Sequence, residues 1–286
     1  MRSLDSPPEI MADRSGFRPT GYTRGAPWAA VIGMLALSWA PVLSEAEGRV
    51  EGRPTAAQTQ VDHMAWDLLL KRHVASGLVD YEGFRQDRAA LDRYLASLQD
   101  VQPSQLSSRQ AQLAFWINAY NANVVKGVLD HYLLVSVKEV KGFFDRVRYR
   151  VGGRDLTLNE IEGEGRALGD WRIHFAVVCA ATGCPVLRSE AYVPERVGAQ
   201  LDEQISRYLV DDVHGMRIDY ASKTLWVSKI FKWYAKDFVP AGPLTAKSLW
   251  AVIGGFVPQN KPLLPVPEQF SLKFLDYDWS LNAQRP

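Results

Sequence analysis

The chain has 286 residues, of which 47% are hydrophobic and 23% are charged, and this composition excludes a disordered, collagen-like or coiled-coil protein. Its 33 Lys and Arg residues nearly balance its 32 Asp and Glu residues, so net charge gives no general attraction to nucleic acid. Two Cys and five His residues are too few for a disulfide framework or a cysteine-rich zinc module. We therefore expect no nucleic-acid partner, no metal and no cofactor.

Residues 1–46 have the features of a secretory signal. An uncharged apolar stretch at residues 26–44 follows several arginines and precedes a small-residue site ending at Ala46. Its apolar centre is about a dozen residues, shorter than the ~20 that cross a bilayer, so cleavage is expected and an uncleaved membrane anchor is the alternative. Met11 is an alternative start. The prediction is a periplasmic or secreted protein that meets a membrane only through this segment if it is retained.

The rest of the chain is expected to be a flexible lead-in at residues 47–60 and a single domain at residues 61–286. Helical periodicity predicts helices over 61–75 and 85–98, with a short strand or turn at 78–81 between them. Ser107 or Ser108 can cap a long helix that runs to about Tyr132 and is apolar on most of its circumference, so this helix should be buried. A hairpin is expected over 148–158 around Gly152 and Gly153, followed by a short helix or turn at 159–168.

The clearest strand signal lies at residues 171–179, where Ile173, Phe175 and Val177 alternate with other residues. We expect this strand in the centre of a sheet. Further along, the pattern predicts an amphipathic helix at 194–209, a hairpin at 216–227, and helices at 228–238 and about 244–256. Helices beside hairpins, without regular strand–helix alternation, indicate an α+β fold with a central, mostly antiparallel sheet and a long buried helix. A fold like that of papain or transglutaminase is one candidate of this class.

Five segments distributed along the domain carry a family resemblance. They are Leu113–Asn121, Leu156–Glu162, Arg172–Pro185, Ser228–Phe238 and Tyr277–Asn282. Together they resemble one family, the domain of unknown function 547. The similarity runs from about Tyr94 to Asn282 and implies no assigned activity. In eukaryotic relatives the domain occurs beside leucine-zipper, glutaredoxin-like or DEP segments, and the glutaredoxin-like association hints at thiol chemistry.

The main candidates for chemistry are Cys179 and Cys184, which flank a Gly-containing loop after the expected strand. Cys184 is the better nucleophile candidate, and His174 or His131 is the candidate base. In an extended strand His174 and Cys179 point to opposite faces with Cα atoms ~16 Å apart, so His174 cannot activate Cys179 directly. Two alternatives remain open: Cys179 is an inert core thiol, or the two cysteines form a disulfide.

Other polar residues in the matched segments are candidates for supporting roles. Asn118 and Asn121 lie mid-helix and either fix a crossing loop through its backbone or donate hydrogen bonds to an oxyanion. Glu162 or Asp237 is a candidate to orient a histidine, while Arg172 and Asp237 alternatively form an ion-pair framework. The aromatic residues near 231–234 and 277–279 are assigned to the core.

Two hypotheses of function follow. The first is an exported thiol-dependent hydrolase or acyl transferase that acts on amide or ester bonds of an unknown small-molecule or peptide substrate. The second is a non-enzymatic periplasmic binding or interaction domain in which Cys179 and Cys184 form a structural disulfide. The state of the two cysteines discriminates between these hypotheses, because the first requires free thiols and the second requires a disulfide.

Overall fold

The computed structural model describes residues 60–257 and 269–284. The predicted signal segment 1–46 and residues 47–59 of the lead-in lie outside the described residues. Within the described part, no helix combines the length and the apolar character needed to cross a membrane.

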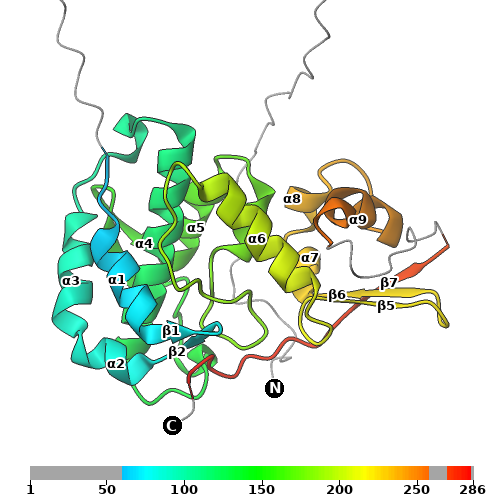
Figure 1. Ribbon diagram of the computed structural model, residues 1–286, viewed down its shortest axis with the longest axis horizontal. Coiled ribbons are helices and arrows are strands. Elements are labelled where there is room, and N and C mark those ends of the chain that lie inside the picture. The colour runs from blue at the N-terminus through cyan, green and yellow to red at the C-terminus, as the bar shows by residue number, and fades with distance from the viewer. Residues whose placement is uncertain (1–59, 258–268, 285–286) are drawn as a thin grey trace, which may run out of the picture. The chain divides into compact units, whose positions relative to one another are not determined.

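The N-terminal part of the fold is helical and centres on a long buried helix. Helix α4 (Arg109–Asp130) lies between α3 and α5 (Figure 1), and the Ser108 side chain caps it by accepting a hydrogen bond from the Ala111 N–H. Almost every residue of α4 beyond its first turn is buried, because it is apolar on most of its circumference. The two expected helices before it are confirmed as α1 (Met64–His73) and α3 (Arg88–Ser97), and the expected short strand or turn at 78–81 contains β2 (Leu78–Val79). Strand β1 (Val74–Ala75), which pairs with β2, and helix α2 (Tyr81–Gln86) were not predicted.

The glycine pair after α4 forms the expected hairpin. Strands β3 (Arg148–Val151) and β4 (Arg154–Thr157) pair in antiparallel register, and Gly152 and Gly153 connect them with φ values of 61° and 77°. Such positive values suit glycine because it has no Cβ. Thr157 then begins α5 (Leu158–Arg166) with a capping box to Glu160, so that β4 leads directly into the helix that packs on α4.

The strand expected at residues 171–179 is wrong. Residues Trp171–Phe175 form the 3-10 helix η3, and the N–H groups of Ala176 and Val177 both donate to the Ile173 carbonyl. The residues between the alternating apolar positions, including His174 and Val178, are buried as well. No strand lies beside the segment in the described residues; instead the Asn121 side chain bonds its backbone at residues 176 and 178.

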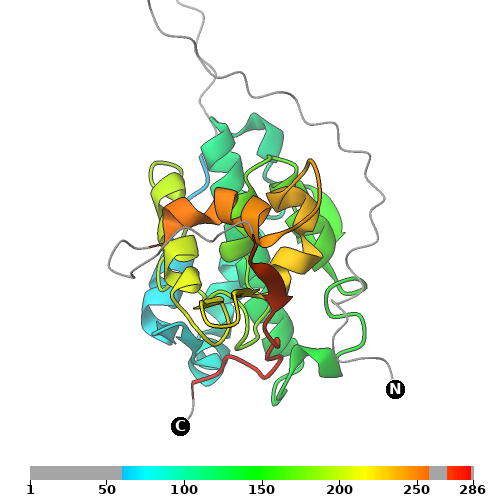
Figure 2. The ribbon, with the colours of Figure 1, turned by 90° about the vertical axis from the view of Figure 1, so that its right-hand side faces the viewer.

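The C-terminal part combines short helices with the largest sheet. Strand β5 (Met216–Asp219) pairs antiparallel with β6 (Thr224–Val227), and β7 (Ser271–Phe274), which the sequence pattern did not predict, pairs parallel with β6. Figure 2 shows β7 in front with the C-terminal segment running down from it. The expected helices are α6 (Val197–Leu209), the pair α7 (Lys229–Trp233) and α8 (Ala235–Phe238), and α9 (Ala246–Ile253).

The fold is α+β, as predicted. The strands of the described residues form three small sheets rather than the expected single central sheet. Two hydrophobic clusters make up the core, one around α4 and one between α6, the β5–β7 sheet and α9. Short 3-10 helices complete the connections, at Pro103–Gln105 (η1), Val137–Glu139 (η2) and Gly254–Phe256 (η4).

Candidate active site

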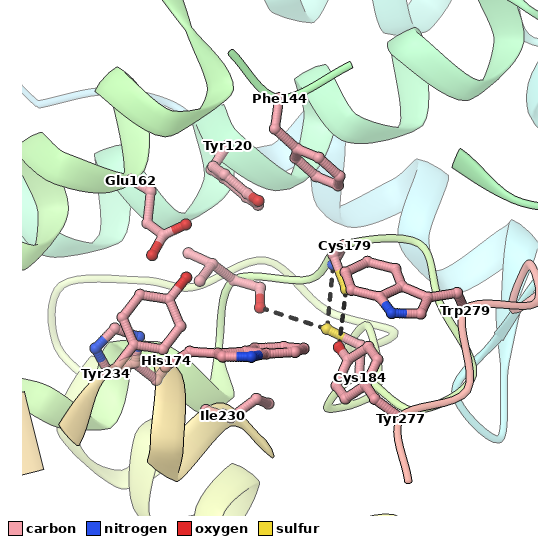
Figure 3. Close-up of a pocket in the computed structure, with 12 residues that line it drawn as sticks. Tyr120, Phe144, Glu162, His174, Cys179, Cys184, Ile230, Tyr234, Tyr277 and Trp279 are labelled. Carbon is pink, nitrogen blue, oxygen red and sulfur yellow. Dashed lines mark hydrogen bonds between the residues drawn. The ribbon is translucent and has the colours of Figure 1, made fainter. Parts of the chain in front are cut away.

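A small pocket lies where α4, α5, the segment after η3, α7 and the C-terminal segment meet. Its cavity is about 40 Å³, and a cavity needs roughly 10–15 Å³ to hold one water molecule. The pocket therefore accommodates the end of a small group rather than a whole large ligand. Figure 3 shows both cysteines together on one side of it and Glu162, His174 and Tyr234 on the other. The lining residues are Tyr120, Phe144, Glu162, His174, Val177, Cys179, Cys184, Ile230, Trp233, Tyr234, Tyr277 and Trp279.

The cysteine loop is held in place by the C-terminal segment. The Thr182 N–H donates to the Ser280 carbonyl and the Gly183 N–H to the Asp278 carbonyl, each at 2.8 Å. A Cβ on Gly183 would lie 2.7 Å from the backbone nitrogen of Asp278, so only glycine permits this close approach. The Tyr208 hydroxyl donates to the Gly183 carbonyl at 2.8 Å. The loop is thus fixed between α6 and the end of the chain.

Both cysteines are free thiols and lie together in the pocket. The backbone N–H of Cys179 donates to the Cys184 sulfur at 3.1 Å, and the Cys179 sulfur contacts the Tyr277 hydroxyl at 3.0 Å. Cys179 is half-buried and Cys184 is buried, so Cys179, for which a core position was one alternative, is the more exposed of the two. The tight turn at Ala180, with φ of 58°, turns both side chains into one space.

The surroundings shift the pKa values of the two thiols in opposite directions. Burial acts to raise the pKa of Cys184, but hydrogen bonds from Cys179 and Tyr277 to its sulfur outweigh burial, and its pKa falls below the usual value. Burial raises the pKa of Cys179, and the neighbouring Cys184 adds to this effect. Of the two thiols, Cys184 therefore gives up its proton more readily than Cys179.

His174 forms a buried pair with Asp237 at another wall of the pocket. The His174 Nε2 lies 2.8 Å from Asp237 Oδ2, and Arg166 bonds the same carboxylate through two nitrogens at 2.8 and 3.1 Å. Burial acts to raise the pKa of Asp237, yet the bonds from His174 and Arg166 outweigh it and hold the pKa well below its usual value. The Tyr234 ring lies against the imidazole with a centroid distance of 3.7 Å. Asp237 thus fixes the ring of His174, as the orienting-acid hypothesis requires.

The expectation that His174 and Cys179 point apart along an extended strand is wrong, because the segment is not a strand. The 3-10 turn shortens the path from residue 174 to residue 179, and both side chains line the pocket. In the part of the chain that the structure describes, Nε2 of His174 bonds Asp237 and Nδ1 has no hydrogen-bond partner. Neither nitrogen bonds a sulfur.

Of the three glutamates on α5, only Glu162 lines the pocket. It is 3% exposed, and one of its oxygens, Oε1, has no hydrogen-bond partner among the described residues. Glu162 also interacts with the Tyr234 hydroxyl, and burial together with this carboxylate raises the pKa of Tyr234 well above its usual value. Glu160 caps α5, and Glu164 pairs with Arg154. The acidic cluster is therefore divided between a helix cap, the surface and the pocket.

The two asparagines of α4 bond to the backbone of crossing segments. Asn118 donates to the Tyr192 carbonyl at 2.8 Å and accepts from the Tyr192 N–H at 3.0 Å. Asn121 donates to the Ala176 carbonyl at 2.9 Å and accepts from the Val178 N–H at 3.0 Å. Both amides are thus occupied in supporting loops, and Asn121 supports the segment that leads into Cys179.

Two other candidate residues do not line the pocket. The His131 ring bonds the Gly127 carbonyl at the end of α4, and Arg172 is engaged with Asp170 and Asp202. Arg172 thus takes part in an ion-pair framework, the alternative role predicted for it. The described residues contain no group of three or more His, Cys, Asp or Glu side chains able to hold a metal ion.

The sequence interpretation missed the aromatic wall of the pocket. Trp233, Tyr277 and Trp279 pack on one another, with ring centroids 4.7–5.9 Å apart, and all are only partly buried. They were assigned to the core, although the position of Tyr277 and Trp279 in a family-like segment was a usable signal. Tyr277 matters most, because its hydroxyl contacts the Cys179 sulfur and a hydrogen bond from it lowers the pKa of Cys184.

Taken together, the structure defines an α+β domain with a buried dithiol and an Asp–His pair in one aromatic pocket. Residues 103–209 match the family model described as "Protein of unknown function, DUF547", which confirms the resemblance to this family. The match contains Asn118, Asn121, Glu162, His174 and both cysteines, and it ends before α7 and the C-terminal segment. No curated protein and no solved structure matches the chain.

Proposed function

We propose that the protein is a thiol-dependent hydrolase or acyl transferase that acts on amide or ester bonds, with Cys184 as the nucleophile. The observation that carries the proposal is the environment of the Cys184 sulfur. It lies in a pocket, accepts a hydrogen bond from the Cys179 N–H at 3.1 Å, and has a lowered pKa despite its burial. A thiolate held in this way is the form of cysteine that attacks carbonyl carbon.

In the proposed reaction the Cys184 thiolate attacks the carbonyl carbon of the substrate and forms a thioester. The bond to the amine or alcohol breaks, and this leaving group takes a proton from the donors beside the sulfur, the Cys179 thiol or the Tyr277 hydroxyl, which contact one another at 3.0 Å. Water or another acceptor then attacks the thioester carbon. The acceptor gives its proton to a base, and the Cys184 sulfur leaves as a thiolate. That proton, passed from the base across the pocket, restores the donor pair.

We assign His174 the role of base for the acceptor in the second step. Asp237 holds the Nε2 side of the imidazole at 2.8 Å, which leaves Nδ1 to accept a proton. Because His174 lines the same pocket as Cys184, a group bound between them is within reach of both. His131 has no part in this scheme.

We also propose that the protein acts outside the cytoplasm, on the support of the apolar segment at residues 26–44 alone. In such a compartment the burial of Cys184 shields its thiolate from oxidation.

The test is acylation of the purified protein by p-nitrophenyl acetate, followed by intact mass. Cys184→Ser and Cys179→Ser are matched variants, because each removes one sulfur of the same pair. We expect one acetyl adduct in the wild type and in Cys179→Ser, and none in Cys184→Ser. An adduct that survives in Cys184→Ser contradicts the assignment of the nucleophile.

A parallel alkylation under denaturing, non-reducing conditions tests the alternative. Two added labels agree with the free thiols on which the proposed reaction depends. If the protein takes up neither a label nor an acetyl group, the enzyme hypothesis is wrong, and a binding domain with a Cys179–Cys184 disulfide takes its place.

A further inference from the structure

The inner wall of the pocket holds two buried polar atoms without a partner. Oε1 of Glu162 and Nδ1 of His174 both lack a hydrogen bond within the described residues, and both residues line the same cavity. Glu162 is 3% exposed and the side chain of His174 is 0% exposed. A buried polar atom without a hydrogen bond destabilises the fold, so two of them beside one cavity point to a missing ligand group.

Both of these atoms are hydrogen-bond acceptors. A carboxylate oxygen only accepts. The carboxylate of Asp237 at Nε2 of His174 selects the tautomer with the proton on Nε2, which leaves Nδ1 as an acceptor. The missing group must therefore donate at least two hydrogen bonds.

The charges around the cavity favour a cation. Glu162 and Asp237 are acidic, and Arg166 is the basic side chain engaged with Asp237 through two hydrogen bonds. Arg166 lies on the Tyr234 ring at 5.0 Å and also interacts electrostatically with Glu162 from a distance. Within the described residues, however, the Glu162 carboxyl group forms no ion pair and Oε1 has no hydrogen bond.

The walls suit a small ammonium group on an alkyl chain. Figure 3 shows the Glu162 carboxylate pointing into the space between Tyr120 and Tyr234, with Phe144 and the cysteines further along. Aromatic faces attract cations, and they also bury methylene groups. A primary ammonium carries three N–H donors, enough for both orphaned acceptors, and the cavity of about 40 Å³ has room for such an end group.

We infer that Glu162 and His174 form a binding site for a primary ammonium group, such as the end of a lysine-like side chain or an alkylamine, in the pocket that contains Cys184. The binding itself does not depend on the proposed reaction; its use does. In that reaction the amine is either part of the acyl donor or the acceptor that attacks the thioester.

The test is titration of the whole protein with n-butylammonium chloride in an amine-free buffer, followed by ligand-observed NMR. Butyrate and n-butanol are the anionic and uncharged comparisons. We expect saturable binding of butylammonium alone, with nuclear Overhauser contacts from its methylene protons to tyrosine ring protons of the pocket. Absence of saturable binding to the wild type, or equal binding of butanol, overturns the inference.

Two variants locate the site on α5. Glu162→Gln removes the unpaired charge, whereas Glu164→Gln removes a charge from the same helix that pairs with Arg154 at 2.9 Å. Binding should weaken by about tenfold or more in Glu162→Gln and stay unchanged in Glu164→Gln. Equal weakening in both variants means general electrostatic attraction and overturns the site. If Glu162→Gln does not fold, the contacts to the tyrosine rings in the wild type decide.

A final measurement separates the two sources of the amine. The wild type is acylated with p-nitrophenyl acetate in the presence of butylamine, and the products are analysed by mass spectrometry. If N-butylacetamide is among the products, the amine is the acceptor that attacks the thioester. If acetate is the sole product, the amine belongs to the acyl donor. Failure of acylation with retained butylammonium binding refutes the proposed function and leaves the ammonium site standing.

Discussion

Replacing Asn121 by leucine should destabilise the domain and also disturb the cysteine pair. The Asn121 amide makes two buried hydrogen bonds, one to the Ala176 carbonyl and one from the Val178 N–H. Leucine has the same number and branching of side-chain heavy atoms but none of them is polar, so it leaves both backbone groups buried and unpaired. These groups directly precede Cys179, whose own N–H bonds the Cys184 sulfur.

The magnitude follows from the two lost partners. Each buried backbone group left without a hydrogen bond costs about 1–3 kcal/mol, so the free energy of unfolding should fall by about 2–6 kcal/mol for the two groups. In a domain of this size, 1 kcal/mol shifts the melting temperature by about 2–4 °C. We therefore expect the Tm to fall by about 4–24 °C.

Asn118→Leu is the matched control. Asn118 makes the same pair of bonds to Tyr192, on a segment that carries no cysteine. Calorimetry should show a similar loss of stability in both variants, while the alkylation rate of the folded protein should change only in Asn121→Leu. An unchanged Tm in Asn121→Leu, or equal changes in thiol reactivity in the two variants, would refute the reasoning.

Three further predictions concern the thiol, the buried acid and the N-terminal segment. Tyr277→Phe should raise the pH midpoint of Cys184 alkylation by about one unit, because the variant loses a hydroxyl that lowers the pKa of Cys184; an unchanged midpoint in iodoacetamide kinetics would contradict this. Asp237→Asn should be less stable than the wild type at neutral pH. The pKa of Asp237 is lowered in the folded state. The stability that its carboxylate contributes is therefore complete above the unfolded pKa of about 3.9 and declines as the pH falls below it. In urea unfolding, the difference in free energy of unfolding between the wild type and Asp237→Asn should thus shrink below about pH 4 and stay constant above it. Deleting residues 1–46 should leave a folded protein of monomer size in gel filtration, and aggregation or unfolding would place that segment within the domain.

The sequence patterns predicted the elements whose signals are local. The Ser108 cap, the glycine pair at 152 and 153 and the amphipathic spacing of α6 each depend on residues close together in the chain. These features predicted the long buried helix and both hairpins, and with them the α+β class. Among the pocket-lining residues, Glu162, His174 and both cysteines were also candidates from the sequence.

The remaining features depend on partners distant in the chain. Residues 171–179 have the alternation of a strand, but the hydrogen bonds that fix them come from Asn121 on another element. Strand β7 is short, half-exposed and formed by parallel pairing with β6, so its signal lies in the partner rather than in its own sequence. For the same reason the contact between Tyr277 and Cys179 was not predicted, since 98 positions separate them.

The C-terminal segment forms one side of the pocket, so the pocket is completed late in the synthesis of the chain. Residues 278–283 run beside the cysteine loop and reach β2, where Ala283 bridges Val79 and Asn282 accepts a hydrogen bond from the Tyr81 hydroxyl. A ribosome has made both cysteines long before it adds Tyr277. A nascent chain therefore carries two thiols without the Tyr277 hydroxyl that lowers the pKa of Cys184, and the pocket takes its final form only when residues 277–283 dock. Until that segment has been made, the proton of Cys184 is held more tightly than in the folded domain.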